Sequence, residues 1–342
     1  MKNSCQSYLI KLIEGEDLEQ EEARILMNSI MEGEVTDAQL GGLITALAIK
    51  GEAVSEIVGF AQAMRYKAAA ITSKHRNLID TCGTGGDGSS TFNISTACAL
   101  VVASAGIPVA KHGNRSVSSK CGSADVLEEL GVNINMKPHQ VASCIDEIGI
   151  GFLFAPTFHP AMKHAAVPRK ELGFRSIFNL LGPLTNPLQA NFQMLGVFNQ
   201  EKTETLAKVL AGLGIKRATV VSGYDGLDEV SIGGPTKITE LYNGDIHSYI
   251  FNPEEVGIKR AAIEQLKGST SKENAAIILD ILNGKTGPKR DIVLLNSAFA
   301  LMTGNVAKDV TEGLRMAKEA IDSGASLKVL RQLIDYSRRE VA

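Results

Sequence analysis

The 342-residue sequence contains no tryptophan, and aromatic residues make up only 5% of it. Its five cysteines include no C-x-x-C pair and are odd in number, so we expect reduced thiols rather than a disulfide framework or structural zinc. The longest apolar run, residues 97–110, is interrupted by Ser and Gly and is too short to span a membrane. Lys2, Lys11 and Glu14 break any signal-peptide core, so we expect a cytoplasmic protein without membrane contact.

Charge and composition exclude two further classes of protein. Thirty-five Lys and Arg against 38 Asp and Glu give a net charge of −3, which offers no overall basic field, so we expect no nucleic-acid partner. The hydrophobic content of 44% is that of a folded chain rather than a disordered one. At roughly 100–200 residues per domain, the length suggests two domains, or one large domain with a smaller companion.

Hydrophobic periodicity divides the chain into a helical first part and an α/β remainder. Apolar residues at helical spacing predict four short helices over residues 4–65 and a small helical domain over residues 1–72. Beyond this point short apolar runs alternate with helical stretches, which predicts an α/β domain over residues 73–342 with a largely parallel sheet. The expected strands are the runs 78–79, 107–110, 151–154, 194–198 and 218–222.

Two stretches interrupt this alternation. Residues 159–172 have a helical pattern, and residues 178–187 are predicted to form an apolar turn locked by two prolines. We expect this region, about 160–187, to join the N-terminal helices rather than the sheet. The last part, residues 271–342, is again predicted to be helical.

A glycine-rich loop follows the first predicted strand. Residues 83–88 contain four glycines, and a helix is predicted to begin near Asn93. Such a loop can adopt positive φ and point its N–H groups at a ligand, and the helix N-terminus adds partial positive charge, so the segment predicts a phosphate site. The alternative is an ordinary strand-to-helix turn, which needs only one or two glycines.

The neighbouring residues argue against two common kinds of phosphate site, a dinucleotide site and a Walker A nucleotide site. Gly83, Gly85 and Gly88 match G-x-G-x-x-G, but a dinucleotide site wants an acidic residue after the next strand, and that strand ends in a basic loop. A Walker A loop is excluded because no lysine follows Gly88.

The basic loop carries Lys111, His112 and Arg115 within five residues. In an open α/β sheet, it should lie beside the glycine loop, so that a ligand with several phosphate groups could be held from both sides. The alternative is a solvated run of surface charge.

Asp228 and Glu229 follow the predicted strand 218–222. Adjacent carboxylates repel each other without a nearby cation, and Mg²⁺ is commonly held by one or two carboxylates together with substrate phosphates. Arg169 presents a planar fork that suits a carboxylate on a second substrate. The alternative for Asp228 and Glu229 is a pair of surface acids, and the alternative for Arg169 is a surface ion pair. The five-residue spacing of His159 and His164 does not predict a metal site.

Together these motifs resemble the anthranilate phosphoribosyltransferases of tryptophan biosynthesis. The similarity runs in order over nearly the whole chain, and it rests on residues 83–87, 93–96, 111–116, 177–187 and 228–229. It implies transfer of the 5-phosphoribosyl group from phosphoribosyl diphosphate (PRPP) to the amino group of anthranilate, which gives N-(5-phosphoribosyl)anthranilate and diphosphate. It also implies a ligand cleft between the small N-terminal helical domain and the larger α/β domain with its mostly parallel central sheet.

The resemblance assigns roles residue by residue. The residues implied to contact PRPP are Gly83, Gly86, Asp87, Thr91, Asn93, Ile94, Ser95, Thr96, Lys111, His112, Gly113, Asn114, Arg115, Ser116, Val117, Ser118, Ser119 and Ser123. Those implied for anthranilate are Gly83, Asn114 and Arg169, and those for the metal are Ser95, Asp228 and Glu229. No residue is assigned as a general acid or base.

The resemblance further implies two Mg²⁺ ions per monomer and a homodimer formed through the helical domain. Ser176 and Ser222 depart from the family pattern, which commonly has Thr and His there, but neither carries an assigned role. Two other functions stay open: a pyrimidine nucleoside phosphorylase, which shares the helical domain and glycine loop but uses free phosphate, and a non-catalytic nucleotide or nucleic-acid binder. Asp228 and Glu229, called the acid pair below, and Asn114-Arg115 favour the transferase.

Overall fold

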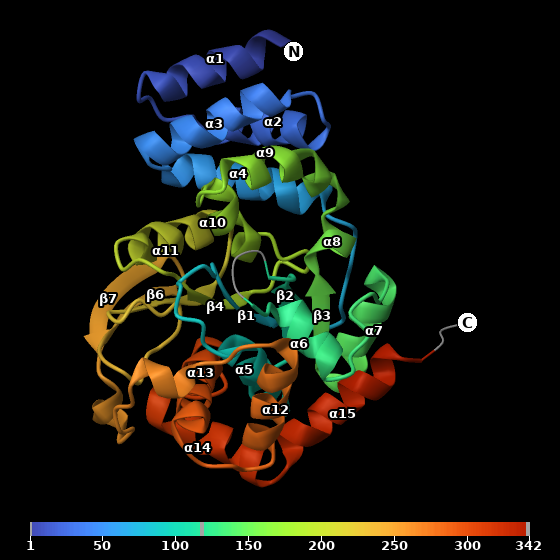
Figure 1. Ribbon diagram of the computed structural model, residues 1–342, viewed down its shortest axis with the longest axis vertical. Helices are drawn as coiled ribbons and strands as arrows, with labels where there is room; N and C mark the ends of the chain where they lie inside the picture. Colours follow the sequence, from blue (N-terminus) through green and yellow to red (C-terminus); the bar gives the residue numbers. More distant parts are fainter. Residues whose placement is uncertain (1, 117–119, 340–342) are drawn as a thin grey trace.

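The computed structural model describes residues 2–116 and 120–339 and places a layer of helices above a single sheet (Figure 1). The first helices of this layer are α1 (Lys2–Ile13), α2 (Gln20–Met31), α3 (Asp37–Lys50) and α4 (Val54–Lys67). Later segments that join them are α8 (Ala155–Phe158), the 3₁₀ helix η1 (Pro160–Ala165), α9 (Ala166–Leu172) and α10 (Ile177–Leu184). The four predicted N-terminal helices are confirmed, and α9 and α10 pack on α3 and α4.

The sheet of the described residues has seven strands in the order β3-β2-β1-β4-β5-β6-β7. They are β1 (Ile79–Gly83), β2 (Val109–Gly113), β3 (Ile150–Phe154), β4 (Phe192–Gly196), β5 (Arg217–Gly223), β6 (Thr236–Tyr242) and β7 (Asp245–Phe251). Strands β1 to β5 are parallel, and β6 and β7 extend the sheet antiparallel. The mostly parallel α/β fold is therefore confirmed.

The remaining helices cover the sheet. They are α5 (Ile94–Ser104), α6 (Ser123–Glu129), α7 (Pro138–Ile148), α11 (Lys202–Gly212), α12 (Ser271–Leu282), α13 (Pro288–Thr303), α14 (Val310–Asp322) and α15 (Ala325–Ser337), with the short 3₁₀ helices η2 (Pro253–Val256) and η3 (Ile263–Leu266). The predicted helical character beyond residue 271 is confirmed for the described residues. In Figure 1, α12 to α15 lie on the opposite side of the sheet from α1 to α4.

Side chains that alternate along each strand separate two cores. Met194 of β4 packs in the cluster formed with α5 and α13, whereas the next residue, Leu195, packs in the cluster formed with α4, α10 and α11. Both faces of the inner strands are buried along most of their length, as is usual for parallel sheets.

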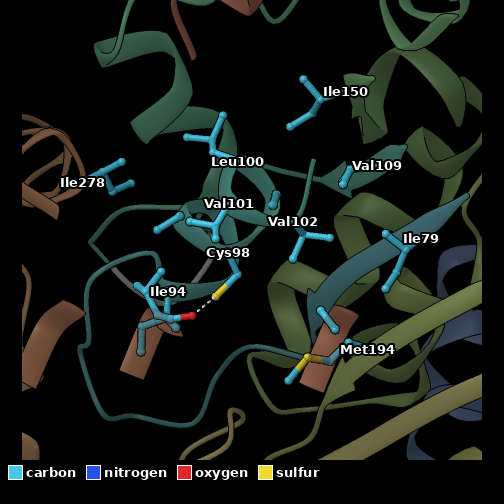
Figure 2. Close-up of a cluster of buried hydrophobic side chains, with 14 of the residues drawn as sticks. Ile79, Ile94, Cys98, Leu100, Val101, Val102, Val109, Ile150, Met194 and Ile278 are labelled. Carbon is cyan, nitrogen blue, oxygen red and sulfur yellow. Dashed lines mark hydrogen bonds between the residues drawn. The ribbon is translucent and has the colours of Figure 1, made fainter. Parts of the chain in front are cut away.

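Helix α5 lies at the centre of the larger core. Figure 2 shows its residues Cys98, Leu100 and Val102 among side chains of the sheet, including Ile79 and Val109. A helix that is apolar on nearly every side must be buried all round, and burial of this kind contributes about 1.5–3 kcal/mol for each large apolar side chain. This packing fixes α5 on the sheet, and thereby fixes where its N-terminus points.

One sequence expectation needs correction, and one part of the sheet was not predicted. Residues 178–184 form most of helix α10 rather than a turn. The Asn179 side chain accepts the Ser176 N–H at its start, and Pro183 falls in its last turn, where it removes one helix hydrogen bond just before the helix ends. The hairpin of β6 and β7 was not predicted at all.

The domain boundary at residue 72 stays a prediction. Among the described residues, no helix has both the length and the apolar character needed to cross a membrane.

Candidate active site

A cavity of about 360 Å³ lies at the carboxyl ends of the parallel strands, between the sheet and α10. This cleft brings together the predicted site residues that the structure describes: Gly83, Gly86, Asp87, Thr91, Asn93, Ile94, Ser95, Thr96, Lys111, His112, Gly113, Asn114, Arg115, Ser116, Ser123, Arg169, Asp228 and Glu229. Val117, Ser118 and Ser119 lie outside the described residues. The proximity expected of the glycine loop and the basic loop is confirmed, whereas the individual binding roles stay predictions.

The glycine loop has the backbone conformation that its sequence predicts. Gly85, Gly86 and Gly88 have positive φ, and α5 begins directly afterwards at Ile94. The free N–H groups of the α5 N-terminus therefore line the cleft together with the loop, which makes this wall suited to an anion.

The basic loop is anchored differently at its two ends. The Lys111 side chain is buried, and its Nζ donates to the Thr81 carbonyl oxygen at 2.6 Å, which leaves a positive charge beside α5. Arg115 instead pairs with two carboxylates of α6, donating from Nη1 to Asp125 Oδ1 at 2.9 Å and to Glu128 Oε2 at 2.8 Å. The guanidinium of Arg115 is therefore engaged by protein carboxylates, although the residue lines the cleft.

Asp228 and Glu229 both lie beside the phosphate-site segments. Asp228 Oδ2 accepts the Gly85 N–H at 2.9 Å, and Glu229 lies near Ser95 at the start of α5. Burial raises the pKa of Asp228 to about 6, and the nearby charge of Asp87 adds to this effect, while the Gly85 N–H and Arg175 oppose it. Burial, and then the charge of Asp228, raise the pKa of Glu229 well above its usual range.

Asp228 approaches strands β1 and β4 so closely that two positions require glycine. A Cβ on Gly83 would lie 2.4 Å from Asp228 Oδ2, and a Cβ on Gly196 would lie 1.5 Å from the Asp228 carbonyl oxygen. The end of β4 can therefore carry no side chain, because the segment with the acid pair passes directly over it.

The donor set fits Mg²⁺. In the described parts of the chain, no group of three or more His, Cys, Asp or Glu side chains forms a cage that would hold a metal by itself. The cleft instead has two carboxylates whose burial disfavours their charged forms unless a cation is near, with the hydroxyl residue Ser95 beside them. Mg²⁺ uses few protein carboxylates and completes its shell with water and phosphate oxygens, so this arrangement suits it.

The other end of the cleft is formed by the helical layer. The Arg169 guanidinium stacks on the Phe178 ring at 4.9 Å from its centroid, and burial lowers the pKa of Arg169. Nearby, the rings of His112 and His159 are buried with centroids 5.2 Å apart, and burial lowers their pKa values to about 3 and about 4. Both imidazoles are therefore neutral at physiological pH, whereas the guanidinium of Arg169 carries a positive charge.

Sequence reasoning missed residues that reach the site from distant segments. Asn274 of α12 lines the cleft, where its Nδ2 donates to Asn93 Oδ1 and its Oδ1 accepts the Ser269 N–H, both at 3.0 Å. No local motif marks Asn274, because its partner Asn93 is 181 residues away. Arg175 lies in the turn between α9 and α10, beside Gly86, and a long-range contact alone reveals it.

Sequence comparisons place the whole chain in one group of enzymes. Residues 75–327 match the family described as "Glycosyl transferase family, a/b domain", and residues 6–68 match "Glycosyl transferase family, helical bundle domain". The anthranilate phosphoribosyltransferase of Acetivibrio thermocellus is 55% identical over 327 residues, which is 96% of this chain and 95% of that protein.

Solved structures agree over the same length. The anthranilate phosphoribosyltransferase of Thermus thermophilus has a TM-score of 0.93 and 44% identity, covering 97% of this chain and 99% of its own. That of Saccharomyces cerevisiae, in complex with PRPP and Mg, has a TM-score of 0.91 and 28% identity, covering 98% of both chains. The chain therefore belongs to the anthranilate phosphoribosyltransferase family.

Proposed function

We propose that the cleft binds PRPP and anthranilate and transfers the 5-phosphoribosyl group to the anthranilate amine, with diphosphate as the leaving group. The observation that carries this proposal is the convergence of the glycine loop, the basic loop, the acid pair and Arg169 on one cavity. The two loops suit the phosphate groups of PRPP, the acid pair suits the metal ion, and Arg169 suits the carboxylate of anthranilate.

The glycine loop and the start of α5 form the wall for the diphosphate in this proposal. Backbone N–H groups and a helix N-terminus stabilise negative charge that grows as the bond from the ribose C1 to the diphosphate oxygen breaks. Lys111 adds a fixed positive charge, because its Nζ is held by the Thr81 carbonyl oxygen beside this wall. These groups are already in place, so little reorganisation is needed in the transition state.

Asp228, Glu229 and Ser95 are the proposed holders of Mg²⁺. Bound there, the metal would supply positive charge to the diphosphate oxygens. Two buried carboxylates and the Ser95 hydroxyl group line the cleft beside the diphosphate wall, and we propose that they hold two ions per monomer.

Arg169 and Asn114 are proposed to orient anthranilate, together with the backbone of Gly83 at the end of β1. Stacking on Phe178 leaves the in-plane N–H groups of Arg169 available for two parallel hydrogen bonds to a carboxylate. The aromatic amine has a free lone pair at neutral pH, so no side chain needs to remove its proton before attack. Holding the two reactants in line is therefore the main task of this end of the cleft.

A direct assay tests the proposal. The protein is incubated with PRPP, Mg²⁺ and anthranilate, and the loss of anthranilate fluorescence is followed; we expect consumption that needs all three. Replacing PRPP by ribose 1-phosphate or free phosphate with a pyrimidine nucleoside tests phosphorylase activity instead. A folded protein that consumes no anthranilate under the first conditions contradicts the proposal.

We also propose a homodimer formed through the helical layer and a cytoplasmic location. Large apolar side chains are exposed on this layer, including Ile13 at 69%, Ile49 at 82% and Tyr66 at 84%. Light scattering after size-exclusion chromatography should give twice the chain mass, and Ile13→Lys should lower it. A native mass equal to one chain contradicts the dimer.

A further inference from the structure

Arg175 is an arginine of the helical layer that lies against the glycine loop, beside the residues that line the cleft. It lies in the turn between α9 and α10, and its guanidinium stacks on the Phe198 ring at 4.2 Å from the centroid. The same group lies against the glycine loop, since a Cβ built on Gly86 would be 3.2 Å from Arg175 Nε and 3.3 Å from Nη2. The residue is exposed, so this contact is at the rim of the cleft.

The hydrogen-bond donors of Arg175 have no acceptor among the residues that the structure describes, and it forms no ion pair with them. This distinguishes it from the two cations of the basic loop. Lys111 donates to the Thr81 carbonyl oxygen, and Arg115 donates to Asp125 and Glu128. A guanidinium stacked on a ring uses its face and leaves its in-plane N–H groups free for an anion.

The surroundings of Arg175 favour one particular anion. Gly86 belongs to the proposed diphosphate wall, and the positive charge of Arg175 also acts on Asp228 of the acid pair. Arg169 also stacks on a ring, that of Phe178, and in the proposed function it orients anthranilate. Arg175 instead contacts the glycine loop.

We propose that Arg175 binds the leaving diphosphate from the helical layer, opposite Lys111 and the start of α5. This inference rests on the proposed function. During transfer the amine nitrogen forms a bond to the ribose C1, the bond from C1 to the diphosphate oxygen breaks, and its electron pair stays on that oxygen. The amine proton passes to solvent, and the guanidinium of Arg175 donates to the oxygens that gain negative charge.

The position of Arg175 predicts two effects of opposite sign. Its charge repels a metal ion at the acid pair when no diphosphate is present, and it attracts a metal ion that carries diphosphate. Loss of the charge should therefore weaken magnesium diphosphate binding without weakening the binding of Mg²⁺ alone. A residue that only supported the fold would weaken both.

Titration calorimetry with magnesium diphosphate, and separately with Mg²⁺ alone, tests this prediction on Arg175→Gln, Arg175→Lys and native protein. We expect the Kd for magnesium diphosphate to rise about tenfold to a hundredfold in Arg175→Gln, as for loss of charge-assisted hydrogen bonds, and by less in Arg175→Lys. The Kd for Mg²⁺ alone should not rise. In steady-state assays the KM for anthranilate should change far less than the KM for PRPP.

Arg217→Gln is the matched control. Arg217 also stacks on an aromatic ring, that of Tyr242 at 5.3 Å, but it begins β5 at the edge of the sheet opposite the cleft. This variant loses the same charge and should bind magnesium diphosphate as the native protein does. Thermal melts confirm folding, and Arg175→Lys carries the test if Arg175→Gln is unstable.

Two results overturn the inference: unchanged diphosphate binding in Arg175→Gln, or equal weakening of magnesium diphosphate and Mg²⁺ alone. Failure of the proposed function looks different, because the native protein itself would then neither consume anthranilate nor bind magnesium diphosphate.

Discussion

The buried His159 ring should make the protein sensitive to acid, and His159→Phe should reduce that sensitivity. His159 packs edge-on against His112, which lines the cleft, and burial lowers the pKa of His159 to about 4. In the unfolded chain an imidazole titrates near about 6.5, so below that pH the unfolded state binds a proton that the folded state does not. Stability is therefore lost as the pH falls from about 6.5 toward 4.

The size of this effect follows from the two pKa values. Between pH 6.5 and 4 a single group contributes about 1.4 kcal/mol per pH unit, so lowering the pH from about 7.5 to about 5 should cost about 2 kcal/mol through His159. Buried carboxyl groups act in the opposite direction. The pKa values of Asp80 and Asp228 are raised, mainly by burial, to about 6, so the folded state gains protons there as the pH falls. The native pH dependence is therefore a sum, and only a comparison of variants isolates His159.

Urea unfolding at about pH 7.5 and about pH 5 provides that comparison. Any packing cost of phenylalanine is common to both pH values and cancels, so the free energy of unfolding of His159→Phe should fall by about 2 kcal/mol less than that of the native protein. His139→Phe is the control, because His139 is already exposed in the folded state. If His159→Phe and native protein lose equal stability on acidification, the reasoning about the buried imidazole is wrong.

Three further predictions concern the cleft. Asp228→Asn and Glu229→Gln should mainly reduce Mg²⁺-dependent turnover, and unchanged activity with an unchanged Mg²⁺ requirement would count against a metal role. Arg169→Ala should raise the KM for anthranilate much more than the KM for PRPP; equal effects in steady-state assays would reject its assignment. Gly196→Ala should displace the acid-pair segment, because the new Cβ would lie 1.5 Å from the Asp228 carbonyl oxygen. Calorimetry should show weaker Mg²⁺ binding and a lower Tm, whereas Gly41→Ala, which meets no atom within 4 Å, should leave Mg²⁺ binding unchanged.

Sequence reasoning located the parts of the site whose functional residues come directly after a strand. The glycine loop and the basic loop follow β1 and β2 directly, and parallel neighbouring strands bring such loops to the same sheet edge. Gly85, Gly86 and Gly88 have positive φ, which glycine adopts readily because it has no side chain. Asp228 and Glu229 also follow a strand, although their place beside the glycine loop depends on the strand order.

The errors in the fold have local causes. Strand β7 is an exposed edge with few buried side chains, so it lacks the apolar run by which the inner strands were predicted. Asn243-Gly244, which have positive φ at the turn between β6 and β7, were the available signal for a hairpin. In α10 the two prolines suggested a turn, but Pro183 lies where only the last helical turn is affected.

The strand order explains why the remaining site residues could not be predicted from sequence. β1 has β2 on one side and β4 on the other, so the chain reverses direction across the sheet at the glycine loop, which is where open α/β sheets form ligand clefts. The acid pair follows β5, two strands away from β1, and it reaches the loop only because Gly196 leaves the end of β4 bare. Asn274 comes from the opposite side, through α12. Such contacts depend on packing between distant segments, and residue spacing along the chain carries no information about them.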